Sequence, residues 1–235
     1  MGFARQVAVA AATVLAAAVP RTDPSTHRFV MLGRSVDGRA ITAVETGDPD
    51  SPSKTLVVGC IHGDERAGIA IAAALDRMPP PDETDLWVVP VLNPDGAVAN
   101  TRQNAHGVDL NRNFPWRWRR ERGVFASGPR PLSEPESRIA YRLIERVRPS
   151  VSIWFHQHRD VVDGSTGNVA LERRFARVAG MHVARLAREP GSAVSWETHV
   201  LPRSSSFVVE LRRGTLLPSE VSSFVRAIGA VSVES

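Results

Sequence analysis

The chain has 235 residues, of which 43% are hydrophobic, and a formal net charge of +4 at pH 7. This length and composition predict one domain with a sizeable core. The modest charge permits attraction to anionic polymers such as cell-wall material, but it does not indicate nucleic acid binding. Cys60 is the single cysteine, which excludes an intrachain disulfide, and its apolar neighbours predict a buried, unreactive thiol.

Residues 1–20 predict an export signal. Arg5 provides a positive start, residues 7–19 are uncharged, and small alanines at 16–18 suit a cleavage site. The uncharged run is shorter than the ~20 residues that cross a bilayer. The alternatives are an uncleaved membrane anchor and an ordinary apolar helix. We expect a secreted or envelope-bound protein, with residues 21–26 as a linker and residues 27–232 as the main domain.

After the linker, strand patterns alternate with helix patterns. Residues 29–45 predict a β-hairpin around an Asp37-Gly38 turn. The other expected strands are 54–61, 85–92, 150–155 and 205–211, and the expected helices are 66–75, 133–147, 172–188 and 218–231. Such alternation predicts an α/β fold, a single domain with a mixed, mainly parallel twisted sheet flanked by helices.

Three local features refine this prediction. Pro90 lies inside a predicted strand, which suggests an edge position or a bulge. Asn93-Pro-Asp-Gly96 predicts a turn, and residues 97–132 predict a long loop of the kind that often carries function. Ser133 is expected to cap the helix that follows it.

His62 and Glu65 follow the apolar strand 54–61, at the edge of an α/β sheet where ligand sites form. Two histidines and a glutamate, with a fourth position left to water, make a catalytic zinc site. His156 and His158 both follow strand 150–155 and would face the same side. The H-x-x-E spacing alone is common, so the remaining parts of such a site decide its meaning.

Glu210 lies in the apolar strand 205–211, where a carboxylate is costly unless it is paired or near a metal. The alternative is an outward-facing edge residue or a partner of Arg212. A second polar cluster combines Trp116 and Trp118 with four arginines, at positions 117, 119, 120 and 122. It could indicate stacking on nucleic acid, but a surface loop or a rim that attracts an anionic substrate is favoured.

Seven motifs in order resemble the zinc metallocarboxypeptidase family, and in particular its small bacterial murein-peptide amidases and carboxypeptidases. The similarity covers roughly residues 27–232. The motifs are His62-Gly-Asp-Glu65, Asn93-Pro-Asp-Gly96, Thr101-Arg102, Gly107-Val-Asp-Leu-Asn-Arg-Asn-Phe114, Ser133-Glu-Pro-Glu136, Trp154-Phe-His156 and Phe207-Val-Val-Glu-Leu211. Each is weak alone, but their order and spacing together are specific.

The resemblance implies one zinc ion held by His62, Glu65 and His156, with His156 favoured over His158 because it directly follows the apolar run. It also implies that Glu210 acts as a general base, which takes a proton from zinc-bound water and returns it to the leaving amine.

The resemblance further implies that Arg102 stabilises the oxyanion, and that Asn111 and Arg112 bind a free carboxylate of the substrate. A tyrosine that closes over the substrate in larger family members has no counterpart in residues 189–206, since Tyr141 is the only tyrosine. This absence favours the smaller bacterial members.

The expected function is a secreted zinc-dependent peptidase that hydrolyses an amide bond next to a free carboxylate, with peptidoglycan stem peptides as substrates. One alternative is a zinc-dependent N-acyl amino acid deacylase of the aspartoacylase or desuccinylase type, and the other is an inactive wall-binding relative. We expect a monomer with no nucleic acid partner. Contact with a membrane is expected only through an uncleaved N-terminal segment.

Overall fold

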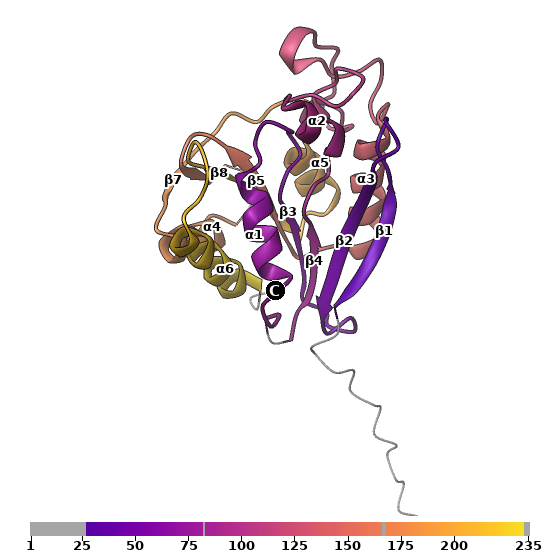
Figure 1. Cartoon of the computed structure of the whole chain (residues 1–235). Helices are drawn as coiled ribbons and strands as arrows, with labels where there is room; N and C mark the ends of the chain where they lie inside the picture. The colour runs from indigo at the N-terminus through magenta and orange to yellow at the C-terminus, as the bar shows by residue number, and fades with distance from the viewer. Residues whose placement is uncertain (1–26, 82, 166–167, 233–235) are drawn as a thin grey trace, which may run out of the picture.

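A computed structural model describes residues 27–81, 83–165 and 168–232, so the predicted export signal and linker lie outside the described residues. Within these ranges eight strands form one sheet in the order β1-β2-β4-β3-β5-β8-β6-β7 (Figure 1). The strands are β1 Arg28–Arg34, β2 Ala40–Gly47, β3 Lys54–Val58, β4 Asp85–Val89, β5 Val151–Gln157, β6 Val161–Asp163, β7 His182–Ala184 and β8 Ser205–Leu211.

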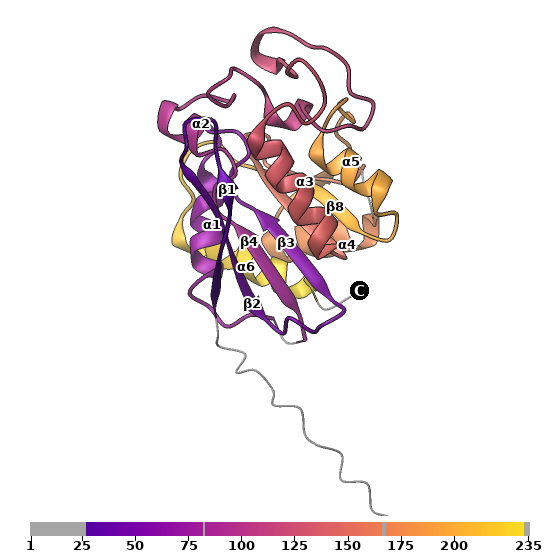
Figure 2. The same ribbon diagram turned by 90° about the vertical axis from the view of Figure 1, so that its right-hand side faces the viewer.

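Helices cover both faces of this sheet (Figure 2). The helices are α1 Ala67–Leu75, α2 Pro94–Ala99, α3 Pro135–Val147, α4 Val169–Ala179, α5 Ala193–Val200 and α6 Pro218–Ser232, with short 3-10 turns η1 Leu110–Arg112 and η2 Gly123–Phe125. None of the helices in the described ranges has the length and apolar character that a membrane crossing requires.

The four central strands, β4, β3, β5 and β8, are parallel, whereas β1 and β2 form an antiparallel hairpin joined to β4. On the other side, β6 runs antiparallel to β8 and parallel to β7. The sheet is therefore mixed and mainly parallel at its centre, and the predicted α/β fold is confirmed. The Asp37-Gly38 turn joins β1 to β2, as its sequence indicates.

The core has two halves because successive strand residues point to opposite faces of the sheet. Val57, Ile153 and Phe155 pack on one face with helices α1, α4 and α6. Leu56 and Trp154 pack on the other face with α3 and α5. Strands β3 and β5 are therefore buried on both sides, which explains why they appear in the sequence as continuous apolar runs.

Two predictions about strands and helices are wrong. The strand with Pro90 is not at an edge: β4 pairs with β2 and β3, and it ends at Val89 because proline has no N–H for the ladder. The predicted helix 172–188 is shorter, because α4 ends at Ala179 and Gly180 adopts a left-handed φ of 75°. The following residues form strand β7 instead.

The loop region 97–132 is largely as predicted, with local differences at its ends. The Asn93–Gly96 turn is the first turn of α2, where the Asn93 side chain accepts a hydrogen bond from the Gly96 N–H at 2.9 Å. Ser133 does not cap α3, since Glu134 holds that position and the Ser133 hydroxyl donates to the Glu134 carboxylate at 2.6 Å. Sequence analysis did not find β6, β7 or α5, which are only three to eight residues long.

Candidate active site

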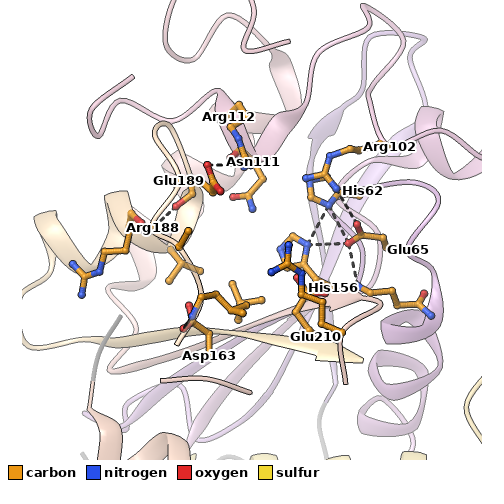
Figure 3. Close-up of a pocket in the computed structure, with 18 of the residues that line it drawn as sticks. His62, Glu65, Arg102, Asn111, Arg112, His156, Asp163, Arg188, Glu189 and Glu210 are labelled. Atoms are coloured by element: carbon orange, nitrogen blue, oxygen red, sulfur yellow. Dashed lines mark hydrogen bonds and ion pairs between the residues drawn. The ribbon is translucent and has the colours of Figure 1, made fainter. Parts of the chain in front are cut away.

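The carboxyl ends of the parallel strands β3, β5 and β8 meet at one edge of the sheet, where the structure has a cavity of about 360 Å³. Every residue that sequence analysis placed in the site lines this cavity (Figure 3). They are His62, Glu65, Arg102, Asn111, Arg112, His156 and Glu210. The order of the strands thus brings together residues that are up to 148 positions apart.

Three buried side chains converge in this cavity. Glu65 Oε2 lies 3.0 Å from His62 Nδ1 and 2.9 Å from His156 Nδ1, and the two Nδ1 atoms are 3.1 Å apart. One donor atom of each residue falls within 4.8 Å of the other two. Two imidazole nitrogens and a carboxylate oxygen are the donor set of a catalytic zinc site, so these residues fit the metal that the sequence predicts.

His158 is not part of this group. It lines the cavity but is exposed, and strand β5 ends at Gln157, one residue before it. The backbone N–H of Gln157 instead donates to Glu65 Oε2 at 3.1 Å, while the Gln157 side chain accepts from the Ala67 N–H at 3.0 Å. Hydrogen bonds of Gln157 therefore connect the end of β5 to Glu65 and to the start of α1.

The loop that carries His62 and Glu65 packs closely against α2. A Cβ atom on Gly63 would lie 1.9 Å from the backbone carbon of Gly96, so only glycine allows this contact. Close packing against α2 thus explains why a glycine lies between the two predicted ligands, which the amino-acid sequence alone did not reveal.

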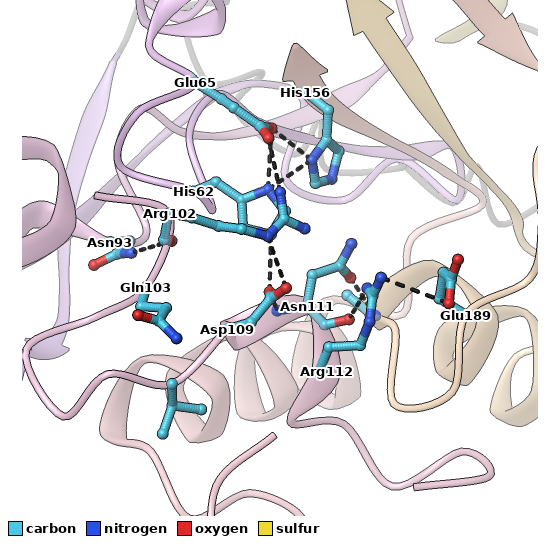
Figure 4. A network of polar contacts seen from close by, with 12 residues as sticks. His62, Glu65, Asn93, Arg102, Gln103, Asp109, Asn111, Arg112, His156 and Glu189 are labelled. Carbon is cyan, nitrogen blue, oxygen red and sulfur yellow. Dashed lines mark hydrogen bonds and ion pairs between the residues drawn. The ribbon is translucent and has the colours of Figure 1, made fainter. Parts of the chain in front are cut away.

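Asp109 is fully buried behind His62 and links it to Arg102 (Figure 4). Its Oδ1 accepts from His62 Nε2 at 2.9 Å, and its Oδ2 accepts from Arg102 Nε at 2.9 Å. A carboxylate on Nε2 directs Nδ1 of the same ring toward the cavity, as in carboxylate–histidine–metal arrangements. Arg102 also donates from Nη1 to Glu65 Oε1 at 3.0 Å.

These contacts shift the pKa values of His62, Glu65 and Asp109. Burial alone lowers the pKa of His62, but the charges of Asp109 and Glu65 outweigh it and raise the pKa to about 9. Burial alone raises the pKa of Glu65 and of Asp109, but His62 outweighs it, and both carboxyl pKa values fall far below their usual range. Both carboxylates are therefore ionised at neutral pH.

Glu210 lies beside His156 on the neighbouring strand, at the position paired with it in the parallel register. It is half-buried, and its Oε2 atom has no hydrogen-bond partner among the described residues. The alternative partner, Arg212, instead binds the Glu220 carboxylate at 2.6 and 2.7 Å. A buried carboxylate oxygen without a partner at the edge of a cavity is available to water or to a substrate.

The predicted carboxylate-binding pair occupies the opposite side of the cavity from Glu65 (Figure 3). Asn111 accepts the Ala193 N–H at 2.9 Å, which places it at the start of α5. Arg112 is buried, its Nε has no hydrogen-bond partner among the described residues, and its nearest carboxylates, Glu189 and Glu121, are 3.6 and 3.7 Å away. A buried guanidinium with free donors can bind an incoming carboxylate.

Sequence analysis did not assign Phe125, Gln157 and Glu189 to the cavity, although all three line it. Gln157 follows a predicted ligand directly, which is a usable signal. Phe125 and Glu189 lie in loops without a periodic pattern, so no signal marked them. Cys60 is buried as predicted, and burial raises the pKa of its thiol to about 12, which makes it unreactive.

Comparison with known proteins supports the same family. A match to the family described as zinc carboxypeptidase covers residues 81–163. The chain is 36% identical over 147 residues to murein peptide amidase A of Escherichia coli and 31% identical over 161 residues to that of Vibrio campbellii. These alignments include 57% and 62% of this chain, and 59% and 64% of the two relatives.

Solved structures extend the comparison over nearly the whole chain. The structure of the murein-tripeptide amidase of Escherichia coli O157 matches with a TM-score of 0.73 and 26% identity, covering 91% of this chain and 96% of that one. Carboxypeptidase A of Helicoverpa armigera shares the fold, with a TM-score of 0.72 and 18% identity over 90% of this chain and 70% of that one. The chain therefore matches the zinc carboxypeptidase family over residues 81–163 and shares the fold of the murein-tripeptide amidase over most of its length.

Proposed function

We propose that this protein is a zinc-dependent peptidase that hydrolyses an amide bond next to a free carboxylate in peptides derived from peptidoglycan. One observation carries the proposal: a metal-binding group, an unpartnered carboxylate and two arginines share one cavity. The relatives named murein peptide amidase support the substrate class.

In this proposal each side of the cavity has its own task. Arg112 and Asn111 hold the free carboxylate of the substrate, and the long ion pairs of Arg112 with Glu189 and Glu121 can give way to it. This contact places the amide bond of the terminal residue near His62 and Glu65. A bound zinc ion supplies a Lewis acid there, which polarises the carbonyl group and makes water more acidic.

Two residues then act on the reacting atoms. Glu210 takes a proton from the attacking water and passes it to the leaving nitrogen, a role that needs a carboxylate with a free oxygen. Arg102 donates to the carbonyl oxygen as negative charge develops on it. Asp109 and Glu65 hold the Arg102 guanidinium through Nε and Nη1, and within the described residues Nη2 has no hydrogen-bond partner.

The test is release of product from L-Ala-γ-D-Glu-diaminopimelate, from a plain dipeptide with a free carboxyl end, and from an N-acyl amino acid. Each substrate is incubated with zinc-loaded protein, with chelated protein and with the Glu210→Gln variant. Cleavage of the wall peptide that requires both zinc and Glu210 supports the proposal. Cleavage of only the N-acyl amino acid favours the deacylase alternative, and zinc binding without any cleavage favours an inactive relative.

We also propose that the protein acts outside the cytoplasm, because residues 1–20 have the composition of an export signal. Expression of the full chain in a bacterial host, followed by fractionation and determination of the N-terminal residue, tests this. A mature protein in the envelope or medium that starts after residue 16 supports it, and an intact chain in the cytoplasm contradicts it.

A further inference from the structure

Phe125 lies at the rim of the active-site cavity, in the 3-10 turn η2, with 45% of its surface exposed. The Cζ atoms of Arg102 and Arg112 each lie over its ring, 5.4 Å from the ring centroid. These are the two arginines that the proposed function uses for the oxyanion and for the carboxylate. One aromatic ring therefore contacts both positive charges of the site.

We propose that Phe125 is a positioning residue, whose ring holds Arg102 and Arg112 at the spacing needed to bind a carbonyl oxygen and a carboxylate of one substrate at the same time. The proposal rests on the proposed function. The role belongs to an aromatic side chain in particular, because a cation is attracted to the negative face of a π-system.

The turn that carries Phe125 is fastened to the segments that carry the arginines. The Gln103 side chain donates to the Gly123 carbonyl at 2.7 Å, and Gln103 directly follows Arg102. The Asp109 N–H donates to the Ala126 carbonyl at 2.8 Å, shortly before Arg112. Hydrogen bonds to Gly123 and Ala126, on either side of Phe125, therefore hold the ring in a defined position although it is exposed.

The Arg112 side chain has few other contacts that hold it in place. Within the described residues its guanidinium makes one hydrogen bond, from Nη1 to the Asn111 carbonyl at 3.0 Å. Its ion pairs with Glu121 and Glu189 are longer than hydrogen bonds. Contact with a ring face uses no N–H group, so Phe125 can hold the guanidinium while the donors stay free for the substrate. The apolar ring also displaces water, which strengthens the electrostatic attraction between the guanidinium and a bound carboxylate.

The test compares Phe125→Leu, which keeps an apolar side chain without the π-system, with Phe125→Tyr, which keeps the ring. Val124→Ala is the matched control, because Val124 is an exposed neighbour on the same turn. The substrates are L-Ala-γ-D-Glu-diaminopimelate and the same peptide with an amide in place of the carboxylate that Arg112 binds. Zinc content is measured for every variant.

For the free acid we expect Phe125→Leu to lower kcat/KM roughly tenfold, the sum of two cation–π contacts, through both a higher KM and a lower kcat. For the amide, KM should stay unchanged and only kcat should fall. Phe125→Tyr and Val124→Ala should retain wild-type values within about twofold. Unchanged kinetics in Phe125→Leu, or an equal loss in Phe125→Tyr, would overturn the proposal.

A second measurement tests the positions of the two arginines independently of catalytic activity. In protein with ¹⁵N-labelled arginine, the Nε–H signals of Arg102 and Arg112 should both move when the ring is lost in Phe125→Leu, and neither should move in Val124→Ala. If neither signal moves in Phe125→Leu, the ring does not hold the arginines. If the signals move but the wild-type protein cleaves no peptide, the contact with the ring stands and the proposed function fails.

Discussion

Glu210 and His156 occupy paired positions on the neighbouring parallel strands β8 and β5. Side chains at paired positions of a sheet point to the same face, so the register alone places the Glu210 carboxylate beside the imidazole. On its other side β8 pairs antiparallel with β6, where Val161 is opposite Glu210. A shift of β8 by one residue would turn Glu210 to the other face of the sheet, which makes the β5–β8 register a requirement for the proposed chemistry.

The first prediction concerns Glu210 itself. Glu210→Gln keeps the size of the side chain but cannot accept a proton, so hydrolysis should fall by roughly 10²- to 10⁴-fold. Zinc content should stay the same, because Glu210 is not one of the three converging residues. The measurement is single-turnover cleavage together with metal analysis. Activity within tenfold of wild type would show that another group moves the proton.

The second prediction concerns the third candidate metal ligand. His156→Ala removes one of three converging donors and should abolish stoichiometric zinc binding, whereas His158→Ala should retain it, since His158 is exposed and outside the group. Zinc affinity is measured by competition with a chromogenic chelator. If His158→Ala loses zinc and His156→Ala keeps it, the assignment is reversed.

The third prediction concerns the buried carboxylate behind His62. Asp109→Asn weakens the hydrogen bond to His62 Nε2 and removes one of the two carboxylates that hold Arg102, so zinc affinity should fall by about 10- to 100-fold. Asp64→Asn is the control, since Asp64 lies in the same loop as His62 but is exposed. Equal affinities for the two variants would show that Asp109 does not orient the ligand.

The fourth prediction concerns Arg112. Arg112→Lys keeps the charge but loses the planar guanidinium, which can donate two parallel hydrogen bonds to a carboxylate. KM for a peptide with a free carboxylate should therefore rise by about tenfold or more. The corresponding C-terminal amide should show little change. Steady-state kinetics with the matched pair of substrates tests this. An equal effect on both substrates would place the carboxylate elsewhere.

The fifth prediction concerns pH and a carboxyl group outside the cavity. Glu197 is fully buried on α5, and burial raises its pKa to about 7, although hydrogen bonds from Ser152, Ser206 and Trp154 act in the opposite direction. A raised pKa in an acid means that the folded state favours the protonated form. The stabilisation is complete below the unfolded value of 4.5 and is lost as pH rises to about 7.

In Glu197→Gln this pH dependence should disappear. The free energy of unfolding of the wild type, relative to that of the variant, should therefore fall by roughly 3 kcal/mol between pH 4.5 and 7 and then level off. Urea unfolding of both proteins in chelator, at several pH values, measures the difference. A constant difference across this range would mean that Glu197 does not titrate there.

Several parts of the protein could be predicted from the sequence because their signals are local. The apolar runs of β3, β5 and β8 and the turn at Asp37-Gly38 depend on neighbouring residues, and the structure contains all of them. Short elements were missed for the opposite reason. Strands β6 and β7 have three residues each and exist only because the edge of the sheet offers hydrogen-bond partners.

The site residues also divide into those with a local sequence signal and those that depend on the tertiary structure. Position after a strand marked His62 and Glu65 as candidates, and position within an apolar strand marked Glu210. Their roles came from the resemblance to the family, because each signal alone is weak. The sequence favoured His156 over His158 because His156 directly follows the apolar run, but both residues follow the same strand. The tertiary structure supports that preference, since Glu65 lies 2.9 Å from His156 while His158 is exposed beyond the end of β5.

The remaining parts of the site depend on contacts between distant segments. Asp109 reaches His62 across 47 positions, and Phe125 covers two arginines from a loop with no periodic pattern. A linear pattern records which chemical groups are present, and near strand ends it also indicates where they lie. It does not record how loops pack on one another, because that packing depends on the whole fold. In this protein, loop packing determines which groups contact the candidate metal ligands and the two arginines.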